Sequence, residues 1–209
     1  MDAQKQFGAF WQRIKASGDS APVFQLLKAR YSEKHRAYHN LKHIDDCLDE
    51  FETVRGRCDD ADAVEFALWF HDVVYDPKAK DNEELSAALA KRICGDVKLP
   101  PAFAEQVETL VLATKHTGEP AGNDAQIMVD VDLSILGKSE AAFHKYERNV
   151  RAEYSWVPES QFRAGRAAIL KGFLARERIY STAYFNQKYE AAARANLARS
   201  LQKLGVRAD

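Results

Sequence analysis

The sequence lacks an excess of charge of either sign. Lys and Arg together number 30 and Asp and Glu together number 31, so the formal net charge of the 209 residues is −1. A chain without a net positive field does not gather nucleic acid or anionic lipid by bulk attraction. We therefore expect neither nucleic acid nor a membrane surface among its partners.

Long apolar runs and a cysteine framework are also missing. No run approaches the ~20 apolar residues that span a bilayer, and the first eleven residues do not resemble a secretory signal. The three cysteines, Cys47, Cys58 and Cys94, form no C-x-x-C pair, which argues against both disulfides and a thiolate zinc site. These absences predict a soluble protein of the reducing cytoplasm.

Linkers rich in glycine, proline or serine are absent, and strand-like alternation is nearly absent, so the sequence predicts a single all-α domain over residues 1–209. Apolar residues recur at helical spacing instead, between residues that commonly begin or end helices. The predicted helices are one capped by Asn40 and ended near Gly56, Ala63 to about Tyr75, one from Asp81 or Asn82 to Gly95, Pro100 to about Thr114, Gln126–Leu136, one capped by Ser139, Pro158–Ala175 and Lys188–Leu204.

The predicted helix from Ala63 to Tyr75 is apolar around its whole circumference, which predicts burial on all sides. It nevertheless carries His71 and Asp72 in its last turns. Because an ionised carboxylate without a partner costs several kcal/mol to bury, Asp72 needs a cation or strong donors. A bound metal, an arginine or a set of backbone donors would each meet this need, and the local sequence leaves the choice open.

Imidazole and carboxylate groups elsewhere in the chain provide further metal-ligand candidates. They are His43, shortly after the predicted cap at Asn40, and the carboxylates of Asp130 and Asp132. A His-Asp pair is common by chance, so a core histidine beside a polar neighbour, with no metal bound, is the competing interpretation. It predicts that Asp72→Asn leaves stability unchanged or improved.

Three segments together resemble the H…HD…D signature of the HD-domain metal-dependent phosphohydrolases. They are Tyr38-His39-Asn40-Leu41-Lys42-His43-Ile44, Phe70-His71-Asp72 and Asp130-Val131-Asp132-Leu133. The chain looks most like a subgroup of predicted phosphohydrolases of similar length. The resemblance implies a single-domain HD-type helical bundle, with a metal-site core at about residues 38–137 and C-terminal helices over residues 139–209 packing on it.

The resemblance also implies that His43, His71, Asp72 and Asp132 bind the metal, with Asp130 as an outer or capping residue. Two nitrogens and two carboxylates favour six-coordinate Mn²⁺, Fe²⁺, Co²⁺, Ni²⁺ or Mg²⁺ over tetrahedral Zn²⁺. Such a centre would activate water to hydrolyse a phosphomonoester or phosphoanhydride of a small metabolite, for which we expect a nucleotide.

Further residues are candidates for catalysis or for contact with substrate. Asp72 and Glu83 are the predicted catalytic carboxylates, although a first-turn position in a helix would explain Glu83 equally well. The candidates to contact substrate or support the ligands are His39, His116, Asp76, Asn82 and Arg151. His39 could instead pack in the loop, and an interhelical ion pair is the commoner role for an arginine such as Arg151.

Other functions remain open beside hydrolysis. A di-iron oxygenase of HD type would need extra ligands such as His39 and His116. A regulatory module could keep the metal and bind a nucleotide without turnover. The segment Val73–Asp76 lacks the Glu-Asp pair of alarmone hydrolases, and no Gly-Tyr-Pro motif of cyclic dinucleotide phosphodiesterases occurs, so both activities are disfavoured. An oligomer is compatible with the sequence.

Overall fold

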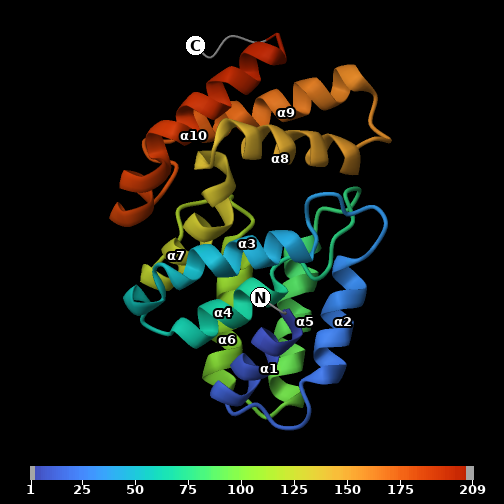
Figure 1. Cartoon of the computed structure of the whole chain (residues 1–209), viewed down its shortest axis with the longest axis vertical. Helices are drawn as coiled ribbons and strands as arrows, with labels where there is room; N and C mark the ends of the chain where they lie inside the picture. Colours follow the sequence, from blue (N-terminus) through green and yellow to red (C-terminus); the bar gives the residue numbers. More distant parts are fainter. Residues whose placement is uncertain (1–2, 206–209) are drawn as a thin grey trace. The chain divides into compact units, whose positions relative to one another are not determined.

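The computed structural model describes residues 3–205, and its regular elements over this range are all helical (Figure 1). No strand occurs among these residues, which confirms the all-α prediction. None of the helices in this range is long and apolar enough to cross a membrane. The elements are α1 Ala3–Arg13, α2 Ala21–Tyr31, α3 Leu41–Glu52, the 3₁₀ turn η1 Arg55–Arg57, α4 Ala61–Phe70, α5 Asn82–Asp96, α6 Pro101–Ala113, α7 Asn123–Asp132, the 3₁₀ segment η2 Leu133–Gly137, α8 Glu140–Glu153, α9 Glu159–Leu174 and α10 Ala183–Lys203.

The chain forms two compact units, Met1–Val129 and Asp130–Asp209. The boundary lies within α7, and therefore inside the metal-site core predicted at about residues 38–137. The prediction of one domain, with C-terminal helices packed on that core, stays a prediction. In the first unit α4 contacts α3, α5 and α6, and α5 packs along α6 (Figure 1).

Helix α4 is the centre of the first unit. Every residue from Ala63 to Phe70 is buried, as its apolar circumference predicts. The carboxylate of Asp60 caps the helix by accepting the backbone N–H of Ala63 at 2.9 Å. Glu65, although buried, pairs with Arg13 and Arg55 and so keeps its charge compensated.

The predicted end of this helix at Tyr75 is wrong, since α4 ends at Phe70. The carbonyl groups of Asp72 and Val73 accept hydrogen bonds from a distant side chain, Arg36. The hydroxyl of Ser86 binds both backbone groups of Val74, at 3.0 and 3.2 Å. Because Arg36 and Ser86 form hydrogen bonds with these backbone groups, the helix can end here without leaving buried backbone groups unpaired. His71 is therefore the C-cap, and Asp72 follows the helix.

Helices α1 and α2 lie where no helix was predicted. Their buried side chains are mainly aromatic, and the rings pack edge-to-face against α4. The ring of Phe7 meets that of Trp69 at a centroid distance of 5.1 Å, and Phe24 meets Trp69 at 6.4 Å. Few but large apolar residues thus stabilise two short helices through tertiary burial rather than through a long periodic pattern.

The second unit is built from η2 and helices α8, α9 and α10, with α10 packing against η2 and α9. Helix α10 begins at Ala183 rather than at the predicted Lys188, because the Thr182 hydroxyl caps it by accepting the N–H of Phe185 at 3.3 Å. The predicted helix Gln126–Leu136 is wrong in its bounds, since it is divided into α7 and η2. The predicted caps Asn40 and Ser139 are confirmed.

Candidate metal centre

His43 points inward from the first turns of α3. The carbonyl oxygen of the Asn40 side chain accepts the N–H of Lys42 at 2.9 Å, and the amide group donates to the carbonyl of Ala37 at 3.0 Å. This cap fixes where α3 begins, and the helix buries Ile44 on the same side. The His43 side chain is only 3% exposed, so the sequence places an imidazole in the interior of the first unit.

His71 is oriented by the backbone of α4. Its Nδ1 lies 2.9 Å from the carbonyl oxygen of Leu68, which can only accept a hydrogen bond. Nδ1 therefore donates this bond, and Nε2 is the nitrogen that faces His43 and Asp72. Metal-binding histidines commonly have their second nitrogen held in this way. The side chain is 1% exposed.

Three potential ligand atoms converge between α3 and the end of α4. The Nε2 atoms of His43 and His71 lie 3.2 Å apart, and Oδ2 of Asp72 is 3.5 Å from the first and 3.2 Å from the second. A point about 1.9 Å from each atom lies inside this triangle, and metal bonds of about 2.0–2.2 Å therefore span it. The donor set fits a divalent metal.

The Asp72 carboxylate is more exposed than the two imidazoles, with 19% of its side chain exposed against 3% for His43 and 1% for His71. Burial raises the pKa of this carboxyl, but the charge of His71 and His39 and the hydrogen bonds from His43 and His71 outweigh burial. The pKa of Asp72 consequently lies well below its usual value. Asp72 is therefore an ionised carboxylate at neutral pH.

The two late aspartates occupy different positions on α7. Asp132 is its last residue and lies three residues beyond Val129, where the first unit ends. Asp130 is fully buried in the second unit, where its carboxylate accepts the N–H groups of Ser181 and Thr182, both at 2.8 Å. Asp130 thereby ties the end of α7 to the start of α10.

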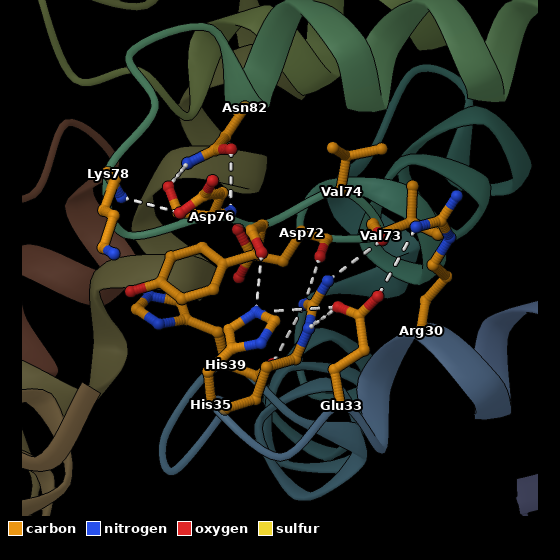
Figure 2. Close-up of polar contacts among 12 residues, drawn as sticks. Arg30, Glu33, His35, His39, Asp72, Val73, Val74, Asp76, Lys78 and Asn82 are labelled. Carbon is orange, nitrogen blue, oxygen red and sulfur yellow. Dashed lines mark hydrogen bonds and ion pairs between the residues drawn. The ribbon is translucent and has the colours of Figure 1, made fainter.

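The predicted substrate residues Asp76 and Asn82 bind each other. Figure 2 shows them beside the segment that carries Asp72. The Asn82 side chain accepts the N–H of Asp76 at 3.0 Å and donates to its carbonyl at 2.9 Å, while the Asp76 carboxylate accepts the N–H of Lys78 at 2.9 Å. These bonds close the turn before α5. Glu83 lies in the first turn of that helix, half-buried.

The remaining candidates lie in three separate settings. The His39 ring stacks on the Tyr75 ring with centroids 4.3 Å apart. His116 follows α6 with a left-handed backbone, at φ 55°. In the second unit Arg151 pairs with Glu159 at 3.0 Å, and it donates to the carbonyls of two further residues. Contact of these side chains with a substrate stays a prediction.

Two neighbours of the centre were not predicted. The guanidinium of Arg36 donates hydrogen bonds to the backbone carbonyls of His39 and Asp72. The thiol of Cys47, one turn after His43 on α3, lies 3.7 Å from Nδ1 of that histidine. The four-residue spacing of His43 and Cys47 could have indicated the second contact. No local sequence signal indicates the contacts of Arg36, since its partners are main-chain atoms.

Comparison of the chain with protein-family models, with curated proteins and with solved structures found no match. The resemblance to the HD-domain phosphohydrolases therefore rests on the three sequence segments alone.

Proposed function

We propose that this protein is a metal-dependent phosphohydrolase whose ion is bound by His43, His71 and Asp72, with Asp132 as a fourth ligand. The observation that carries the proposal is the convergence of two imidazole nitrogens and a carboxylate oxygen within 3.2–3.5 Å of one another. The order and spacing of the H…HD…D segments support hydrolysis as the reaction. Asp132, which ends α7, is included on that resemblance.

The residues of the centre suit this chemistry. A divalent ion bound there would lower the pKa of a water molecule and neutralise charge on a phosphoryl group. Asp72 stays ionised at neutral pH because its pKa is lowered, and its partial exposure gives the centre a side open to solvent. The bond from His71 to Leu68 fixes the ring orientation before any ligand binds.

The proposed substrate is a phosphomonoester or phosphoanhydride of a small metabolite, with a nucleotide as the expected class. The ligand set of nitrogens and carboxylates favours Mn²⁺, Fe²⁺, Co²⁺, Ni²⁺ or Mg²⁺. No glycine-rich phosphate loop occurs in the sequence, so the phosphate would be bound by the ion and its surrounding side chains.

Phosphate release from a panel of nucleoside monophosphates, diphosphates and triphosphates and of sugar phosphates, with Mn²⁺ present, tests this proposal. Asp72→Asn is compared with Asp46→Asn, which alters an exposed carboxylate of α3 that pairs with Lys42. We expect Mn²⁺-dependent release by the wild type and by Asp46→Asn, and a loss of about 100-fold or more in Asp72→Asn.

Two results would contradict the proposal in different ways. Equal rates in Asp72→Asn and in the wild type would remove Asp72 from the reaction. A wild-type protein that binds Mn²⁺ yet releases no phosphate from any substrate would favour the regulatory module without turnover.

A further inference from the structure

Arg36 connects the two segments that carry the proposed ligands. Its side chain is 0% exposed. One terminal nitrogen of the guanidinium donates to the carbonyl of His39 at 3.1 Å and to that of Asp72 at 2.6 Å. The other terminal nitrogen donates to the carbonyl of Val73 at 3.1 Å. A single planar group thus binds the chain before α3 and the chain after α4.

The positions of these carbonyls matter for the ligands. His39 immediately precedes Asn40, the cap residue of α3, and lies four residues before His43 in the sequence. The carbonyls of Asp72 and Val73 belong to the segment in which α4 has already ended. Movement of either segment would change the distance between the His43 nitrogen and the Asp72 carboxylate.

Aromatic rings and a carboxylate hold the guanidinium itself in place. Its central carbon lies 5.2 Å from the ring centroid of Tyr31 and 5.4 Å from that of Tyr75. The Tyr31 hydroxyl donates to the carbonyl of Trp69 at 2.9 Å, within the last turn of α4. Nε of Arg36 pairs with Glu33 at 3.0 Å, and Figure 2 shows Glu33 on the opposite side of Asp72 and Val73 from Asn82.

We propose that Arg36 is a positioning residue of the metal centre: it sets the spacing of His43 and Asp72 by binding the main chain next to each of them. The inference rests on the proposed metal site. Arginine suits this role because its fork carries five donors in one plane, and these reach several acceptors at fixed angles. A lysine would keep the charge but offers one nitrogen, which cannot bind all three carbonyls and Glu33 at once.

The competing role is purely structural, with Arg36 stabilising the first unit without affecting the ligands. Arg166 provides a matched control, because it is also buried, pairs with a glutamate, Glu147, and stacks on a tyrosine ring, that of Tyr146. It belongs to the second unit. Arg36→Lys and Arg166→Lys therefore each remove a buried guanidinium. Only the guanidinium of Arg36 binds the segments that carry the proposed metal ligands.

The experiment measures Mn²⁺ affinity by titration and the visible absorption spectrum of the Co²⁺-loaded protein, together with the denaturant midpoint. We expect Arg36→Lys to weaken Mn²⁺ binding by about 10-fold to 100-fold, as is usual for partners of metal ligands, and to change the Co²⁺ spectrum. Arg166→Lys should lower stability, with affinity and spectrum as in the wild type.

Wild-type affinity and spectrum in a destabilised Arg36→Lys would overturn the inference and leave the proposed function standing. A wild type that binds neither ion would overturn both. If Arg36→Lys does not fold, Glu33→Gln takes its place, since it removes the charged partner of Arg36 at a residue that is 29% exposed. Weaker Mn²⁺ binding in that variant would support the inference, and unchanged binding would overturn it.

Discussion

Single side chains at the candidate metal centre depend on the backbone around them as much as on one another. Nδ1 of His71 donates to a carbonyl of its own helix, and the main chain at Asp72 is bound by Arg36. A change of backbone path of a few tenths of an ångström would therefore alter the ligand distances. The ligand geometry is a property of the local chain as well as of the three side chains.

Burial also controls the reactivity of individual cysteines. It raises the pKa of Cys58 to about 12, with Asp124 adding to the effect, and it raises the pKa of Cys94 to about 12. At pH 8 roughly one in ten thousand of such groups is a thiolate, whereas about a tenth would be at the ordinary cysteine pKa of 9.0. We predict that iodoacetamide alkylates both residues much more slowly in the folded protein than in urea, measured by peptide mass spectrometry.

The comparison is informative for Cys58 in particular, because this residue is only half-buried and so is open to a small reagent. Alkylation of Cys58 in the folded protein at the rate seen in urea would contradict the raised pKa.

The sequence predicts the single residues of the site unequally well. His43 follows a recognisable cap at Asn40, and His71 and Asp72 are adjacent at the end of an apolar segment, so all three carry a local signal. Arg36 carries none, because it acts through carbonyl oxygens that every residue has. Contacts between a side chain and the main chain 36 or 37 residues away cannot be inferred from residue type or spacing.

At the scale of elements, the contact of η2 with α10 depends on a missing side chain. A Cβ added at Gly137 would meet Cβ of Tyr189 in forbidden contact and Cγ at 2.8 Å. Tyr189 lies within α10, so the obstacle includes the rigid base of a helical side chain. The close approach of these two elements therefore requires glycine at this position.

We predict that Gly137→Ala destabilises the protein by about 1–3 kcal/mol, because overpacking forces η2 away from α10. Gly165→Ala is the matched control, since Gly165 lies in the middle of α9 and an added Cβ there meets nothing within 4 Å. Alanine there should be neutral or stabilise by about 0.5–1 kcal/mol, as expected for a helix interior. Urea unfolding monitored by circular dichroism measures both, and equal midpoints for the two variants would contradict the packing described.

Element boundaries show where local sequence is sufficient and where it is not. The start of α3 is predicted correctly because the Asn40 cap is a local interaction. The end of α4 is predicted wrongly because Arg36 and Ser86 remove the following backbone groups from the helix. The apolar residues after Phe70 continue the helical pattern, so nothing nearby in the sequence signals the end.

At the scale of the whole molecule, four weak acids, three of them buried and one half-buried, make stability depend on alkaline pH. Burial raises the pKa of Cys58, Cys94, Tyr31 and Tyr180 in the folded protein. The unfolded chain releases these protons at the ordinary values of 9.0 for cysteine and 10.0 for tyrosine. Above those values the unfolded state binds fewer protons, so the free energy of unfolding falls as pH rises.

We predict that the contribution of these groups is fully present at pH 8 and is lost progressively above about pH 9. Urea midpoints at pH 8 and pH 10.5 measure the loss, and tyrosine absorbance shows whether ionisation accompanies unfolding. A protein with Cys58→Ala and Cys94→Ala should depend less steeply on pH. Equal midpoints at pH 8 and pH 10.5 would show that these groups do not titrate differently in the folded and unfolded states.

The proposed function depends on a divalent metal bound by the imidazoles of His43 and His71 and the carboxylate of Asp72. Metal content per chain, measured by elemental analysis after loading with Mn²⁺ and removal of excess ion, tests it most directly. His71→Ala is compared with His144→Ala, which alters a partly exposed histidine of the second unit. We predict about one ion per chain in the wild type and in His144→Ala, and loss of the ion in His71→Ala. No bound metal in the wild type, or equal metal in His71→Ala, would show that these side chains do not form a metal site.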